Sequence, residues 1–273
     1  MTLQRVPLPA LQKVQQFIRE ALNLPDSERR LESWTSPGSL EEPPMPESLD
    51  DLGDLLKYGN PLGDDLPEID ETGFWLLSAV NPAAALIKLP GLDLQPSWRL
   101  VSYLHRRKTG GISLTWAVPE TLGTTAALEA AIPDSRDRRA VPRPDGVSDN
   151  FMDVIAGDRS NMSFLMASLL RREILDFGAI GADQKWHNHR LIAAVPPKIQ
   201  WQWRNQAPKD LSPKVQIRPE GIAVVEFFSC RVKPPVVICR HLDQYPADRY
   251  SAQCKEQAIA MAPSKRKKLT AKA

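Results

Sequence analysis

The residue types best suited to chemistry lie in residues 183–192, DQKWHNHRLI, where His187 and His189 stand two positions apart. Side chains at this spacing point to the same face of a β-strand, so the two imidazoles can chelate one Zn²⁺-like ion. A tetrahedral site needs one or two further ligands. The available candidates are His105, His241, Cys239 or a carboxylate. No metal-site spacing links them to the pair, so the competing interpretation is a polar strand edge anchored by Trp186.

A cysteine nucleophile is the second chemical candidate. Cys239 and His241 alternate in VVICRHL and therefore lie on the same side of the expected strand. A cysteine in such a strand more commonly packs as a small apolar side chain. No G-x-S-x-G sequence is present to indicate a serine nucleophile.

The loop RRKTGG, residues 106–111, combines three basic side chains with two glycines. It lacks the G-x-x-x-x-G-K-[ST] frame of a phosphate-binding loop, and no helix is expected after it. A hairpin loop that can contact an anion is the interpretation that fits it best.

Aromatic and arginine residues favour a docking surface over a reacting centre. The chain has seven tryptophans, and Trp, Tyr and Arg dominate the contacts that carry most binding energy at protein interfaces. We therefore expect a protein partner and a non-catalytic role in interaction or assembly. The predicted binding residues are Arg106, Arg107, Lys108, Trp186, Arg190, Trp201, Trp203 and Arg204.

Charge keeps two alternatives open. Residues 1–72 have 6 Lys/Arg and 15 Asp/Glu, whereas residues 73–273 have 29 and 18, so an acidic arm precedes a basic body. The basic body and the SKRKK sequence at 264–268 favour a nucleic-acid-associated protein as the first alternative. A metal-dependent enzyme centred on His187 and His189, with zinc as the cofactor, is the second.

The composition indicates the class of protein and its cellular compartment. Apolar residues make up 42% of the 273 residues and charged residues 25%, which suits a globular protein, while 25 prolines favour short elements. The three cysteines form no CxxC, and MTLQRVPLPALQK has no apolar signal-peptide core. We expect a cytoplasmic protein with reduced thiols and, since no window approaches 18 apolar residues, no membrane span.

Periodicity predicts the elements. An amphipathic helix is expected over 9–24, which packs either on its own domain or on a partner, and further helices over 124–132, 160–177 and 246–261. Strands are expected at 74–80, at 98–107 and 112–118 as a hairpin, and in HRLIAAV, KIQWQWR, KVQIR, IAVVEFFSCRV and PVVICRHL.

The fold class is therefore α+β, with a mostly antiparallel sheet of five to eight strands and helices packed on one face. The expected organisation is a helix at 1–24, an acidic Pro/Ser-rich linker at 25–72, an α+β domain at 73–260 and a basic tail at 261–273.

Three segments carry a resemblance to a known family: TWAVPETLGTTAALEAAI, FMDVIAGDRSNMSFLMASLLRREILDFGAIGA and WHNHRLI. They resemble parts of an uncharacterised family of cyanobacterial proteins, over about residues 73–245. The resemblance implies a bacterial cytoplasmic setting and no particular fold, activity or ligand.

Overall fold

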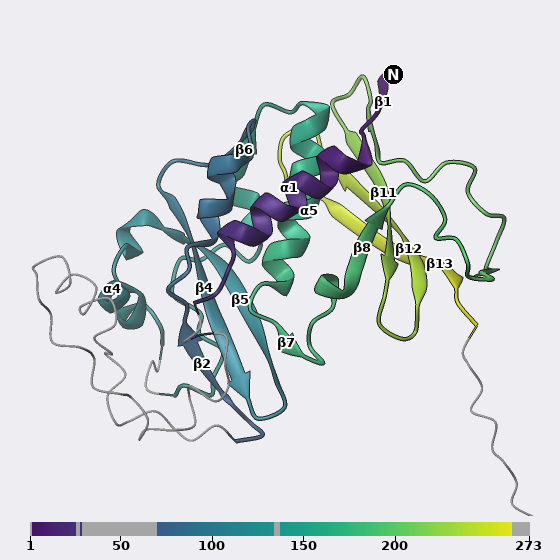
Figure 1. Cartoon of the computed structure of the whole chain (residues 1–273). Coiled ribbons are helices and arrows are strands. Elements are labelled where there is room, and N and C mark those ends of the chain that lie inside the picture. The colour runs from purple at the N-terminus through teal and green to yellow at the C-terminus, as the bar shows by residue number, and fades with distance from the viewer. Residues whose placement is uncertain (1, 26–27, 29–69, 134–136, 264–273) are drawn as a thin grey trace, which may run out of the picture.

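The structure of the chain is a computed structural model that describes residues 2–25, 28, 70–133 and 137–263 (Figure 1). The α+β class with antiparallel sheets is confirmed. The sequence predicts one sheet, but in the described residues the strands form a sheet of seven, a sheet of four and a two-stranded ribbon. The acidic linker falls mostly outside the described residues, as does SKRKK in the tail.

The seven-stranded sheet carries the candidate site. Its strand order is β1-β10-β11-β12-β13-β9, and β8 pairs with β11 beyond the end of β10. All of these pairings are antiparallel. The strands are β1 (Thr2–Arg5), β8 (His189–Ile192), β9 (Gln202–Trp203), β10 (Lys214–Ile217), β11 (Ala223–Arg231), β12 (Val237–Tyr245) and β13 (Gln253–Met261).

The second sheet has the order β2-β4-β5-β7. Its strands are β2 (Phe74–Leu77), β4 (Trp98–Arg107), β5 (Gly110–Pro119) and β7 (Ile180–Gly181), and β3 (Leu92–Leu94) pairs with β6 (Ile155–Gly157) as a ribbon. The predicted hairpin is confirmed, since β4 and β5 pair along their whole length and Arg107 lies opposite Gly110.

Helix α5 (Asn161–Asp176) is the centre of the main core and contacts strands of both large sheets, β5 on one side and β10 and β11 on the other. Both ends of the helix are capped. Ser160 accepts a hydrogen bond from the Ser163 N–H, and Gly178 follows the helix with φ near +71°, a conformation that suits glycine. The buried Phe164, Leu165 and Leu169 belong to the same core as residues of the seven-stranded sheet.

Helix α1 (Leu8–Ala21) lies across α5, as Figure 1 shows. Its apolar stripe buries Leu11 and Ile18 completely, so the helix packs on its own chain. Helix α4 (Thr125–Ala130) confirms the predicted short helix, because the Thr124 side chain caps it by accepting from the Ala127 N–H. Short 3₁₀ turns complete the described elements: η2 (Pro82–Lys88), η3 (Glu120–Leu122), η4 (Phe151–Val154) and η5 (Trp186–Asn188).

Two predictions at the C-terminal end are corrected. The last helix, predicted for 246–261, is wrong, because most of this segment is strand β13 paired with β12. The strand predicted from KIQWQWR is reduced to the two residues of β9. In both cases the secondary structure depends on which strand the segment pairs with, and the local sequence pattern does not show where that strand lies.

Candidate metal centre on the inner face of the seven-stranded sheet

Alternation along β12 places three polar side chains on one face of the sheet. Cys239, His241 and Asp243 stand two positions apart, and all three are buried. Ser229 on β11 lies opposite Cys239, and Glu256 on β13 lies opposite His241. We call this the inner face, because it also carries Val225 and Phe227, which share a core with α5.

His189 joins this face from β8. The sequence pattern predicts His187 and His189 on one strand face, and this prediction is wrong. Residues Trp186–Asn188 form η5, and β8 begins at His189. His187 is exposed, whereas His189 is buried, so the two imidazoles do not share a site.

A chain of hydrogen bonds links the two buried histidines through Ser229. The Ser229 Oγ lies 2.8 Å from Nδ1 of His189 and 2.7 Å from Nε2 of His241. On the far side of His241, Nδ1 lies 3.6 Å from a Glu256 carboxylate oxygen, beyond hydrogen-bond distance, and has no hydrogen-bond partner among the described residues.

Aromatic rings fix both imidazoles in place. Trp186 stacks on His189 with ring centroids 5.2 Å apart and meets His241 edge-on at 5.3 Å. Phe227 stacks on the His241 ring, with ring centroids 4.7 Å apart. The Trp186 indole N–H donates to Glu173 on α5 at 2.7 Å, which holds the indole against the histidines.

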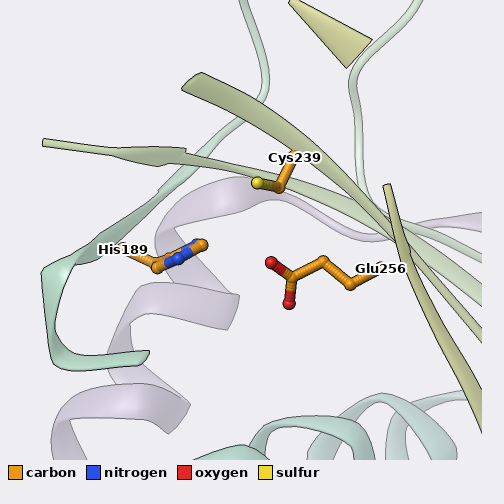
Figure 2. A group of neighbouring side chains, drawn as sticks. All are labelled: His189, Cys239 and Glu256. Carbon is orange, nitrogen blue, oxygen red and sulfur yellow. The ribbon is translucent and has the colours of Figure 1, made fainter. Parts of the chain in front are cut away.

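His189, Cys239 and Glu256 bring three metal-binding atoms together. A ring nitrogen, the thiol sulfur and a carboxylate oxygen all lie within 4.8 Å of one another. Figure 2 shows the three side chains, from three different strands, converging on one space. His189 and Cys239 are buried and Glu256 is about half exposed, so the cluster reaches the surface through the Glu256 side chain.

Burial controls the protonation of these groups. It raises the pKa of the Cys239 thiol to about 12, and the negative charge of Glu256 adds to the shift. Burial also lowers the pKa of His189, and it lowers that of His241 well below the usual value with help from the charge of Arg172. Both imidazoles are therefore neutral at pH 7, the form that binds metal ions.

The predicted binding residues do not form one surface. Arg106 and Trp186 are buried, which corrects their assignment to a docking surface. Arg106 donates to the carbonyls of His105, Gly178 and Glu28. Arg107 pairs with Asp183 beside the exposed Lys108, on the β4–β5 hairpin. Arg190, Trp201, Trp203 and Arg204 belong to the β8–β9 region, where the tryptophans are half-buried and the arginines exposed.

Sequence reasoning missed Ser229 and Glu256. Ser229 lies within the apolar sequence FFSCRV, where a lone serine gives no signal. Glu256 falls in the segment wrongly predicted as a helix, so its position opposite His241 was hidden. Alternation in CRHLD was the usable signal, since it places Cys239, His241 and Asp243 on one strand face.

In the described part of the chain, no helix is long and apolar enough to cross a membrane. Comparisons with protein-family models, with curated proteins and with solved structures found no match to this chain.

Proposed function

We propose that the protein binds one divalent transition-metal ion of the zinc class through His189, Cys239 and Glu256. The supporting observation is the convergence of imidazole, thiol and carboxylate atoms within 4.8 Å. These are the three ligand types that Zn²⁺ uses in proteins. Of the two metal ligands predicted from the sequence, His187 and His189, this proposal keeps only His189.

The distances suit an ion of this size. Around a tetrahedral Zn²⁺, with bonds of about 2.0–2.3 Å, neighbouring ligand atoms lie about 3.3–3.8 Å apart. Ligand atoms up to 4.8 Å apart therefore need to approach by about 1 Å. The half-exposed Glu256 side chain has the freedom to supply that movement, while stacking holds His189. Three protein ligands leave the fourth position for water on the open side, as in catalytic zinc sites.

A metal ion explains the cluster better than a cysteine nucleophile does. A nucleophilic cysteine needs a cationic neighbour that lowers its pKa. The pKa of Cys239 is instead raised to about 12, because burial and the anionic Glu256 outweigh the opposing charge of Arg231. A divalent cation would neutralise the thiolate and the carboxylate together.

The test is metal loading of the full chain. After the chain has been stripped with a chelator, reloaded with Zn²⁺ and dialysed, we expect one Zn²⁺ per chain by elemental analysis. After loading with Co²⁺ we expect an intense near-ultraviolet band from thiolate bound to cobalt. Cys239→Ser should abolish that band, and Glu256→Gln should weaken binding. The matched controls are Cys230→Ser, a buried thiol on the opposite sheet face, and His187→Ala. Binding that survives Cys239→Ser, or that depends on His187, would contradict the proposal.

The opposite face of the seven-stranded sheet favours a second candidate function, the protein interaction predicted from the sequence. We infer that the helices pack on the inner face, and that a groove on this outer face, beside its buried apolar residues, receives a partner. On the outer face a separate apolar cluster joins the sheet residues Phe228, Ile238 and Ala260 to Leu211 and the two tryptophans of the β8–β9 region. It borders a groove of about 450 Å³.

The charge of the groove suggests an acidic partner. Four basic side chains line it, together with two acidic ones. Glu226 is paired with Lys214 and Arg240, and Asp210 is paired with Arg5. Within the described residues, the exposed Arg204 and Lys209 have no ion-pair partner, so they are available to carboxylates of another protein.

Affinity capture from the native cell, with and without nuclease, tests this second candidate. A nuclease-resistant partner that is lost when Arg204→Glu and Lys209→Glu are combined would support it. Lys198→Glu, on an exposed residue that does not line the groove, is the control. Recovery that disappears with nuclease would instead favour the nucleic-acid alternative.

A further inference from the structure

Four polar side chains follow one another on the inner face, in the order Glu256, His241, Ser229 and His189. Hydrogen bonds join the last three, and Glu256 lies 3.6 Å from His241. The two ends of this chain, Glu256 and His189, are also two of the proposed metal ligands. The two middle members are fully buried, and neither belongs to the proposed ligand set. We call these four side chains the relay and ask where its protons lie.

The proton on His241 is set by Glu256. A neutral imidazole carries one N–H, and the other nitrogen presents a lone pair. Nδ1 of His241 faces a carboxylate oxygen at 3.6 Å and has no hydrogen-bond partner in the described residues. A lone pair there would face a negative charge in a buried site, whereas an N–H there is attracted by it. The carboxylate therefore favours the Nδ1–H tautomer.

Ser229 transmits this choice to His189. With its proton on Nδ1, His241 has a lone pair on Nε2, which accepts the Ser229 O–H at 2.7 Å. A serine hydroxyl has a single proton, so towards His189 its oxygen acts as an acceptor. Nδ1 of His189, 2.8 Å from that oxygen, must then carry the N–H. The remaining nitrogen of His189, Nε2, is left with its lone pair free.

We propose that the relay of Glu256, His241 and Ser229 fixes His189 in the Nδ1–H tautomer and so prepares its Nε2 as a metal ligand. Ser229 and His241 are thus positioning residues, and the carboxylate that would bind the ion also prepares its imidazole partner. The proton positions are inferred from the distances along the relay and from the charge of Glu256. Their consequence for metal affinity rests on the proposed function.

Packing makes the relay rigid enough to transmit a tautomer. The His189 ring is held by Trp186 and the His241 ring by Phe227, so neither imidazole can turn over without breaking a stacked contact. Ser229 lies on the central part of β11, paired with both β12 and β8. A ligating histidine whose second nitrogen is held by a hydrogen bond is a recurrent feature of zinc sites, and loss of such a partner lowers metal affinity about 10–100-fold.

The first experiment reads the tautomers directly in the metal-free full chain. With ¹⁵N-labelled histidine, long-range ¹H–¹⁵N spectra distinguish a protonated from an unprotonated ring nitrogen. The four histidines are assigned by the loss of one signal each in His187→Gln, His105→Gln and His241→Asn, which leaves the fourth signal to His189. We expect His189 and His241 each to carry the proton on Nδ1 only. A proton on Nε2 of His189 in the wild type would overturn the proposal.

The second experiment breaks the relay without touching a proposed ligand. In Ser229→Ala we expect His241 to keep its tautomer, His189 to become a mixture, and zinc affinity to fall about 10–100-fold, while the cobalt–thiolate band remains. Ser229→Thr, which keeps the hydroxyl, should restore the single tautomer. Zinc affinity in Ser229→Ala within twofold of wild type would overturn the proposal.

A variant at the exposed end of the relay tests the proposal even if Ser229→Ala fails to fold. Glu256→Ala changes a half-exposed residue and should leave His189 as a mixture of tautomers in the metal-free chain. Glu256→Gln keeps an oxygen acceptor and should preserve the Nδ1–H form. An unmixed His189 in Glu256→Ala would contradict the relay. If the wild type bound no zinc, the proposed function would fail while the tautomer measurement still decided the relay.

Discussion

The guanidinium of Arg172 on α5 donates two hydrogen bonds to the carboxylate of Asp243 on β12, at 2.5 and 2.7 Å, and both side chains are buried. Asp243 lies two positions from His241 on the same strand face. The ion pair therefore joins the central helix to the strand that carries two members of the candidate site.

Removing one charge of this pair should be strongly destabilising. In Asp243→Asn the Arg172 charge stays buried without its counter-ion, so we expect the free energy of unfolding to fall by about 3–5 kcal/mol in urea titrations. The control is Asp149→Asn in the exposed pair with Arg143, where the change should stay below about 1 kcal/mol. Equal effects of the two substitutions would show that the buried pair has no special role.

Replacing both partners should do less harm than replacing one. A double variant, Arg172→Met with Asp243→Leu, removes the buried charges together and fills similar volume. We expect it to regain most of the stability lost in Asp243→Asn, as measured by the same urea titration. A double variant that is less stable than Asp243→Asn would indicate that the pair contributes through geometry that apolar side chains cannot replace.

Acid should destabilise the metal-free protein through its buried histidines. The folded state holds the pKa of His241 well below its usual value of 6.5, so below pH 6.5 the unfolded chain binds more protons than the folded chain. Stability is therefore fully present above pH 6.5 and falls with decreasing pH, by up to about 1.4 kcal/mol per pH unit for this residue.

Urea unfolding at pH 7.5, 6.5 and 5.5 measures that slope. His241→Asn should make it shallower, while His187→Gln, on an exposed residue, should leave it unchanged. If the slope were identical in wild type and His241→Asn, the acid sensitivity would have to come from other groups.

The N-terminal helix should behave as part of the core. Leu11 and Ile18 are fully buried against the main cluster, so Leu11→Ala or Ile18→Ala should lower the free energy of unfolding by about 2–5 kcal/mol. Gln12→Ala, on the exposed face of the same helix, is the control. Core and surface substitutions with equal effects would mean that α1 is not docked in solution.

Local signals predicted the elements that have strong local codes. Helix α5 was predicted from its broad apolar face and the glycine that ends it, and both signals lie in neighbouring residues. The β4–β5 hairpin likewise has its turn encoded between its strands. Helix α1 was predicted by its apolar stripe, but its packing partner, α5, was not.

The candidate site depends on long-range pairing, which explains why so little of it could be predicted. His189 and Cys239 are separated by 50 positions and meet because β8 and β12 both pair with β11. Glu256 enters through a strand whose local pattern resembles a helix. The split of His187 from His189 comes from a 3₁₀ turn that the H-x-H spacing does not reveal.

Zinc K-edge X-ray absorption on the zinc-loaded full chain tests the metal centre most directly. The account predicts one sulfur at about 2.3 Å with nitrogen and oxygen ligands at about 2.0–2.2 Å. It also predicts that this sulfur is lost in Cys239→Ser and kept in Cys230→Ser. A shell of nitrogen and oxygen alone in the wild type, or a sulfur that survives Cys239→Ser, would contradict the account.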